Sequence, residues 1–213
     1  MNSAKSSRFR KKFGRRIQLT AFLIVPLIIW TAAATADTLV PTTVISPSDN
    51  SVPTVPFPRG LRLVTLYGGV MEQPTGLREQ LSFCTAGLNY YFADNWAFGV
   101  EFTGVGAAQP DDDIAAGGGD ILLRTHLWSY RRLSIYGDVA VGLLEANNRI
   151  PPSGTDFNFT LQSGVGAAIH LWPHTDFFTG LRYYHLSNAR QHGPDRNPSL
   201  NAIEGYAGLM FRM

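Results

Sequence analysis

A histidine and a serine lie two residues apart in the stretch His185-Leu186-Ser187. A serine hydroxyl becomes a nucleophile when a base within hydrogen-bond reach takes its proton, and histidine is a common base of this kind. Residues at positions i and i+2 share one face of a β-strand. If this segment is a strand, the spacing predicts covalent catalysis with Ser187 as nucleophile and His185 as base.

Such a pair needs a third group that orients the imidazole, and it needs donors for the oxyanion of the tetrahedral intermediate. Polar candidates for these roles lie in the loop that follows and in the last segment of the chain. They are Asn188, Asn197, Asn201 and Glu204.

Beyond residue 59 the chain consists of eight segments with apolar residues at alternate positions, separated by turn residues. These segments are 60–70, 80–92, 96–107, 120–130, 133–146, 157–171, 176–188 and 201–212. Alternation over such lengths indicates β-strands with one apolar face and one polar face. The polar face includes Arg124, His126, Gln162 and Arg182, which we expect to fill the interior of a small barrel without a pore.

The connections between the segments alternate in length. Those near 93–95, 131–132 and 172–175 are short, and those near 71–79, 108–119, 147–156 and 189–200 are long. Short turns on one side and long loops on the other are typical of outer-membrane barrels. The sequence therefore predicts an all-β fold, an eight-stranded antiparallel transmembrane β-barrel of the outer-membrane type. The alternative is a soluble eight-stranded barrel of the lipocalin kind, whose apolar face would point inward.

The N-terminal part differs from the rest. Residues 1–36 contain a basic stretch, an apolar run and the small residues Ala34-Thr35-Ala36, which together predict a cleaved signal peptide; the alternative is a retained membrane anchor. Residues 37–59 are rich in Pro, Ser and Thr and predict an extended linker, so the barrel is expected at 60–213.

The net charge of +2 depends on this leader, because seven of the 18 basic residues lie within the first 16 positions. Removing them leaves 11 basic residues against 16 acidic ones, a net charge of −5. A nucleic-acid-binding domain needs a basic patch on its folded part. The composition therefore predicts no nucleic-acid partner.

Strand parity places His185 and Ser187 on the same face as Leu181 and Tyr183, which is the face expected to meet lipid. Polar groups facing hydrocarbon cost free energy unless they are paired, so folding alone does not explain them. With both chain ends on the inner side, the strand at 176–188 runs outward. The pair is then expected near the outer leaflet.

The stretch His185-Leu186-Ser187-Asn188-Ala189, followed by Asn197-Pro198-Ser199-Leu200-Asn201 and a final strand, resembles the lipid A 3-O-deacylase (acyloxyacyl hydrolase) family. Members of that family are eight-stranded outer-membrane barrels with a His-x-Ser-Asn motif at the end of the seventh strand. The resemblance extends upstream through 164–167 and 136–144.

The resemblance implies a serine esterase that hydrolyses the 3-linked acyl ester of lipid A in lipopolysaccharide, within outer-membrane lipid and without a cofactor. Ser187 would attack the ester carbonyl, and His185 would take and return the proton. Asn188 and Asn197 match positions associated with the oxyanion environment.

This sequence departs from the family at the third member of the triad. The family has Glu at the position that corresponds to Asn201, and the next acid, Glu204, lies three residues further along. Apolar residues at odd positions, such as Ile203 and Leu209, mark that face as outward, so Glu204 is expected to point into the barrel. Parity therefore favours Asn201 as the orienting residue. Glu204 remains the alternative, through a shifted register or a bulge.

Other interpretations stay open at this point. The chain can be a structural or adhesion-type barrel without catalysis, because a fold does not determine a function. A homodimer is an open alternative to a monomer. No metal is expected, because His126 and His170 point inward by parity and are interpreted as barrel filler.

Overall fold

The described part of the chain forms eight β-strands. This computed structural model describes residues 56–74, 80–107, 113–151, 154–191, 193 and 199–213, so the expected signal peptide and most of the expected linker lie outside the described residues. The strands are β1 (Arg62–Glu72), β2 (Gln80–Ala93), β3 (Trp96–Ala107), β4 (Ile114–Tyr130), β5 (Leu133–Ile150), β6 (Thr155–Trp172), β7 (Thr175–Ser187) and β8 (Leu200–Arg212).

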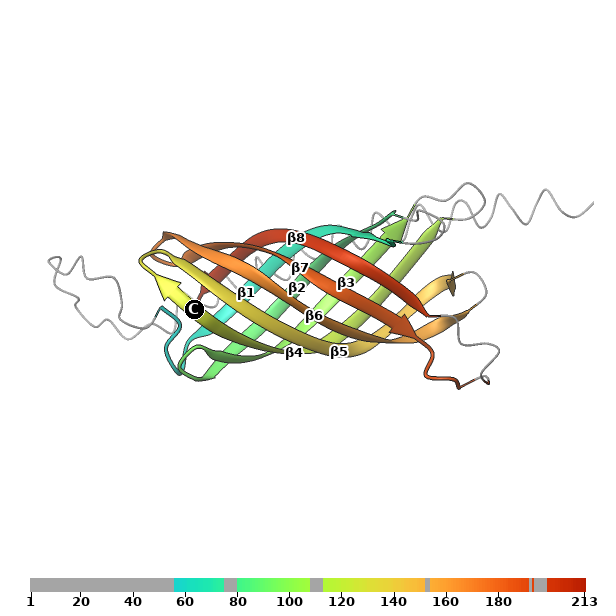
Figure 1. Cartoon of the computed structure of the whole chain (residues 1–213), viewed down its shortest axis with the longest axis horizontal. Helices are drawn as coiled ribbons and strands as arrows, with labels where there is room; N and C mark the ends of the chain where they lie inside the picture. The colour runs from blue at the N-terminus through green and yellow to red at the C-terminus, as the bar shows by residue number, and fades with distance from the viewer. Residues whose placement is uncertain (1–55, 75–79, 108–112, 152–153, 192, 194–198) are drawn as a thin grey trace, which may run out of the picture. The chain divides into compact units, whose positions relative to one another are not determined.

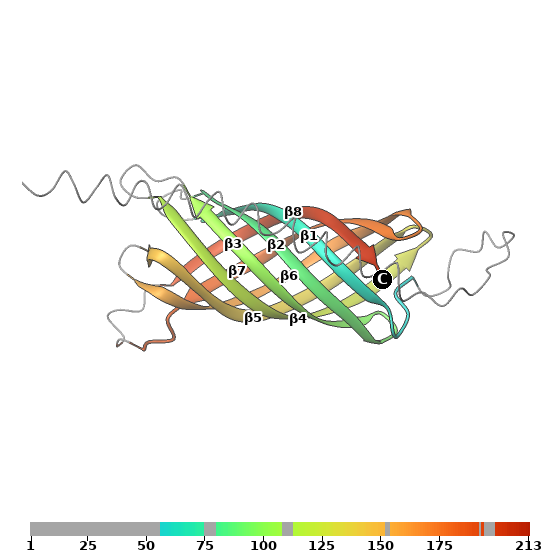
Figure 2. The same ribbon diagram turned by 180° about the vertical axis from the view of Figure 1, so that it is seen from behind.

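These strands close into one antiparallel barrel. Each strand pairs with the next along the chain, and β1 pairs with β8 to complete the ring. The strands run obliquely around the barrel (Figure 1), and the view from behind shows β1 beside β8 where the barrel closes (Figure 2). No helix long and apolar enough to cross a membrane occurs among the described residues.

Short and long connections lie at opposite ends of the barrel. The strand bounds leave two residues each for the connections 94–95, 131–132 and 173–174, and these lie at the same end as the C-terminus (Figure 1). Asn95 and Arg131 adopt φ values of 65° and 53°, the left-handed conformation that tight hairpin turns require. The opposite end, here called the long-loop end, carries the connections 73–79, 108–113, 151–154 and 188–199.

Two strands extend four or more residues beyond the segments that the sequence pattern predicts. β4 begins at Ile114 rather than at residue 120, and β5 extends to Ile150 rather than to residue 146. The added part of β4 is rich in Gly and Ala, so it has no alternating apolar pattern. It is nevertheless paired, since residues 117–119 lie opposite residues 143–145 of β5. Ladder hydrogen bonds join backbone groups, so a partner strand extends β4 without help from side chains.

The two faces of the barrel wall confirm the predicted fold class. Large apolar side chains are exposed on the outer face of the barrel, with exposed fractions of 67% for Phe102, 59% for Val165 and 59% for Leu181. Arg124 and Arg182 are instead buried inside. A lipocalin-like barrel would show the reverse arrangement, so that alternative is wrong.

A network of charged side chains occupies the centre of the barrel. Both oxygens of the Asp138 carboxylate are bound by Arg182, at 3.1 and 2.9 Å from its Nε and Nη2, and Arg124 Nη2 donates to the same carboxylate at 2.8 Å. Arg182 Nη1 also donates to Tyr67 Oη at 2.9 Å and lies 3.3 Å from Glu101 Oε2. The expected polar filling of the interior is thus confirmed, and it connects five strands, β1, β3, β4, β5 and β7.

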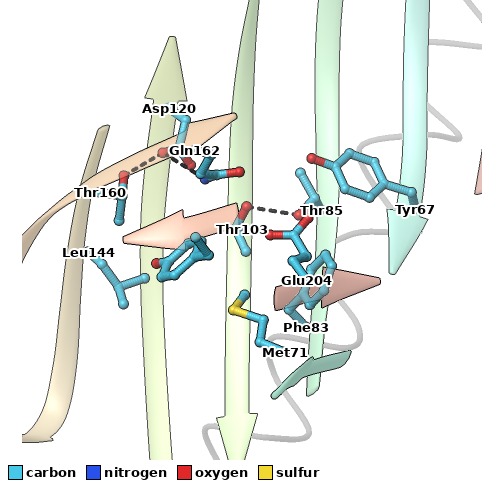
Figure 3. A pocket seen from close by; sticks show the side chains of 11 residues that line it. Tyr67, Met71, Phe83, Thr85, Thr103, Asp120, Leu144, Thr160, Gln162 and Glu204 are labelled. Atoms are coloured by element: carbon cyan, nitrogen blue, oxygen red, sulfur yellow. Dashed lines mark hydrogen bonds between the residues drawn. The ribbon is translucent and has the colours of Figure 1, made fainter. Parts of the chain in front are cut away.

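A second polar group adjoins this network on the side of the long-loop end. Thr160 Oγ1 and Gln162 Nε2 donate to Asp120 Oδ1 at 2.5 and 3.1 Å, and these residues line a small cavity together with Glu204 (Figure 3). The cavity has a volume of about 10 Å³, which is close to the space of one water molecule. Side chains therefore fill the barrel almost completely at this level.

We expect Asp138→Asn to lower the free energy of unfolding by about 3–5 kcal/mol, because two buried guanidinium groups lose their shared countercharge. Urea titration of the protein in lipid vesicles, followed by tryptophan fluorescence, measures this loss. Asp113→Asn is the control, since Asp113 is exposed outside the strands and its change should stay within about 0.5 kcal/mol. Equal losses for the two variants would contradict a stabilising role for the network.

Candidate active site

β7 presents its odd-numbered and even-numbered residues to different surroundings. Arg182, Tyr184 and Leu186 are buried in the barrel, whereas His185 and Ser187 are partly exposed on the outer face. This follows from β7 pairing with β6 on one side and β8 on the other, which leaves each side chain pointing either in or out. The predicted pair therefore shares the outer face, at the long-loop end of the strand.

The register between β7 and β8 brings Asn201 directly opposite His185. His185 Nδ1 lies 2.7 Å from Asn201 Oδ1. Tyr183 Oη donates to the same amide oxygen at 2.5 Å. An amide oxygen has two lone pairs, so these two contacts use its full accepting capacity. Three neighbouring side chains on the outer face thus form one hydrogen-bonded group.

This group determines the tautomer of the histidine. Because the Asn201 oxygen only accepts hydrogen bonds, His185 Nδ1 must carry the proton that is shared with it. The other ring nitrogen, Nε2, is then unprotonated in the neutral imidazole. A histidine held in this form can act as a general base through Nε2, the role that an orienting residue supports in other hydrolases.

The structure places Glu204 away from this group. Glu204 lies opposite Arg182 in the β7–β8 register and is buried inside the barrel, where its Oε1 is 3.8 Å from Arg182 Nη1. It lines the interior cavity with Asp120 and Tyr67 (Figure 3). The barrel wall therefore separates Glu204 from His185, and the structure brings His185 together with Asn201 instead.

Of the two residues expected near the oxyanion, Asn188 and Asn197, the structure describes only Asn188. Asn188 directly follows β7 and is buried, and its Oδ1 accepts a hydrogen bond from the Arg190 backbone N–H at 3.0 Å. It therefore helps to shape the turn after Ser187, in which Ala189 and Arg190 adopt φ values of 52° and 61°. Asn197 lies outside the described residues. The oxyanion roles of both residues stay predictions.

Apolar side chains lie beside Ser187 on the outer face. Its partner in the β6–β7 register is Phe159, and the partner of His185 is Leu161. Phe159 packs edge-to-face against Phe157, with ring centroids 5.6 Å apart. Within the described residues, no hydrogen bond joins the Ser187 hydroxyl to His185. The serine thus lies between a polar group on its β8 side and an apolar surface on its β6 side.

Sequence reasoning missed two residues of this site. Parity places Tyr183 on the same face as His185, but the sequence did not predict its hydrogen bond to Asn201. Phe159 carries no signal of its own, because its position beside Ser187 depends on the register between β6 and β7. A register of this kind is set by pairing between strands and cannot be read from either strand alone.

His126 and His170 lie at the end of the barrel that carries the short turns. His126 is buried, with Ser134 Oγ 2.7 Å from its Nδ1 and Tyr91 Oη 2.9 Å from its Nε2. His170 Nδ1 lies 2.6 Å from the Asp176 carboxylate. Among the described residues no group of His, Cys, Asp and Glu side chains has the arrangement of a metal site.

Comparison with known proteins gives one family and a set of similar folds. A family model described as lipid A 3-O-deacylase (PagL) matches residues 75–210, more than half of the chain. No curated protein matches the sequence.

Three solved outer-membrane structures are similar to the chain. Neisserial surface protein A has 15% sequence identity and a TM-score of 0.55, over 72% of this chain and 96% of that one. OprG from Pseudomonas aeruginosa has 13% identity and a TM-score of 0.45, over 74% and 97% of the two chains. Ail of Yersinia pestis has 12% identity and a TM-score of 0.47, over 73% and 99%. At these identities the likeness concerns the fold alone.

We expect NMR of the ¹⁵N-histidine-labelled protein in detergent micelles to show His185 protonated at Nδ1 in its neutral form. Asn201→Ala should allow the proton to move to Nε2 in part of the molecules, because the acceptor at Nδ1 is lost. Glu204→Gln should leave the His185 signals unchanged, since this residue lies inside the barrel. A His185 tautomer that responds to Glu204→Gln but not to Asn201→Ala would contradict this assignment.

Proposed function

The chain belongs to the lipid A 3-O-deacylase (PagL) family, and on that premise we propose that it is an outer-membrane serine esterase that hydrolyses the 3-linked acyl ester of lipid A. The observation that carries the proposal is the His185–Asn201 hydrogen bond of 2.7 Å on the outer face of the barrel. It supports a base that is held in one tautomer beside a serine on the same strand face.

In the first half of the reaction, Ser187 Oγ attacks the carbonyl carbon of the ester, and His185 Nε2 takes the hydroxyl proton. The tetrahedral intermediate then collapses, the bond between the carbonyl carbon and the sugar oxygen breaks, and the imidazolium returns its proton to the leaving alkoxide. The products are 3-deacylated lipid A and an acyl chain bound to Ser187 as an ester.

In the second half, water attacks the acyl-enzyme while His185 Nε2 takes one of its protons. The new tetrahedral intermediate breaks the bond to Ser187 Oγ, which receives the proton from His185, and the fatty acid leaves. Asn201 remains hydrogen-bonded to Nδ1 in both halves. It holds the ring in place but, being neutral, stabilises the imidazolium less than a carboxylate would.

The surroundings of Ser187 suit a lipid substrate. The long-loop end of such barrels faces the outside, so His185 and Ser187 lie in the outer leaflet, where lipid A resides in a lipopolysaccharide-containing membrane. Phe159 and Leu161 offer an apolar surface next to the serine. An acyl chain lying along this surface would place its ester carbonyl near Ser187, whereas the sugar would lie toward the polar group on β8.

We expect Ser187→Ala and His185→Ala each to lower deacylation by at least about 10³-fold, the scale seen when one member of a catalytic triad is removed. Mass spectrometry of lipid A from cells that express each variant measures the loss of one hydroxyacyl chain. Both variants should still fold into the outer membrane, because both residues lie outside the interior network.

An unchanged lipid A profile with the wild-type barrel folded in the outer membrane would overturn the esterase proposal for this substrate. The alternative, a structural or adhesion-type barrel without catalysis, would then be favoured. Activity retained by Ser187→Ala would overturn the assignment of the nucleophile alone.

We expect Phe159→Ala to raise KM for lipid A several-fold and to weaken discrimination between long and short acyl chains. The reason is that the acyl chain loses apolar contact with the ring, and each buried methylene contributes about 0.8 kcal/mol to binding. Initial rates with lipid A of defined chain lengths in detergent micelles test this. The control is Phe102→Ala, a change on the outer face of β3. A KM that rises equally in both variants would contradict a local role for Phe159.

A further inference from the structure

The last residue of β1 places a carboxylate on the outer face of the barrel, next to the strand that carries Asn201. Glu72 is exposed and lies opposite Ile203 in the β1–β8 register. Ile203 is two residues from Asn201 and shares its outward face. Glu72 and Asn201 are therefore diagonal neighbours across one strand pair, about 7–8 Å apart in such a geometry with their Cβ atoms somewhat closer, within reach of a long side chain such as that of Glu72.

Of the acidic residues in β7, β8 and β1, only Glu72 faces outward. The other two, Asp176 and Glu204, are buried inside the barrel. Within the described part of the chain the Glu72 carboxylate has no ion-pair partner, so its negative charge is not already neutralised by a neighbouring strand.

The amide nitrogen of Asn201 offers hydrogen-bond donors for a further contact. Its oxygen accepts from both His185 and Tyr183, whereas its Nδ2 group carries two N–H donors that point away from these contacts. Glu72 lies on the opposite side of Asn201 from His185, because β8 lies between β7 and β1. A carboxylate there is the natural acceptor for an amide donor.

We propose that Glu72 is a positioning residue of the site, which accepts a hydrogen bond from Asn201 Nδ2 and supplies through Asn201 the negative charge that the third position itself lacks. This inference rests on the proposed esterase function. Glu72 touches neither substrate nor reacting atoms. It polarises the Asn201 amide toward His185 and stabilises the imidazolium that forms during each half of the reaction, in a region that lipid partly shields from water.

The test compares Glu72→Gln with the wild type, using purified lipid A in detergent micelles. We expect kcat to fall on the order of 5–10-fold, the scale of one carboxylate acting on a charge across a partly shielded site, with KM unchanged within about 2-fold. Glu72→Asp should recover part of the rate. Glu145→Gln is the matched control, because Glu145 is exposed on β5, two strands from β7 on its other side.

A double-mutant cycle with Asn201→Glu separates this role from a structural one. A carboxylate at position 201 contacts His185 directly, so Glu72→Gln should then have no penalty, and should raise the rate if the two carboxylates repel each other. A wild-type kcat for Glu72→Gln would overturn the inference. So would a loss of the same size in both backgrounds.

Failure of this inference is distinguishable from failure of the proposed function. If the wild type deacylates lipid A and Ser187→Ala does not, the esterase stands, and the Glu72 variants decide the inference alone. If the wild type does not deacylate lipid A, both are overturned. Migration of the folded barrel in unheated gels verifies that each variant has folded.

Discussion

The closed ladder of backbone hydrogen bonds is the constraint on which the rest of this structure depends. Hydrocarbon offers no partner for a backbone N–H or C=O group, so a sheet in a membrane cannot have a free edge. Pairing of β1 with β8 removes the last edge. Once the ring is closed, every strand has neighbours in a fixed register, and every side chain points either to lipid or to the interior.

β7 illustrates what this constraint achieves for the proposed site. Its even-numbered residue Arg182 connects to Asp138 and Glu101 inside the barrel, while its odd-numbered residues His185 and Ser187 face outward. The interior network therefore holds the same backbone that carries the outer pair. A site built on paired strands keeps its geometry more closely than a site on loops, which suits chemistry that depends on hydrogen-bond distances.

In the proposed site, Asn201 stands where the resemblance implies a glutamate, which separates two tasks that one carboxylate usually performs. The amide retains the geometric task, since its oxygen accepts from His185 Nδ1 and fixes the tautomer. It cannot perform the electrostatic task, because it has no charge to offer the imidazolium. Tyr183 occupies the second lone pair of the amide oxygen, which holds the amide in the orientation that faces His185.

Much of this protein was determined by the sequence itself. A period of two follows from strand geometry alone, so the alternating segments predicted eight strands, an outward His185 and Ser187, and an inward Glu204 before any contact was known. The tertiary structure alone decided which residues meet across strands: Asn201 opposite His185, Phe159 beside Ser187, and Glu72 diagonal to Asn201. It also decided where β4 begins, because its Gly-rich start is held by β5 and not by its own side chains. The physical reason is that register is a relation between two strands, set by their pairing and by the connection that joins them, so the pattern within one strand does not show it.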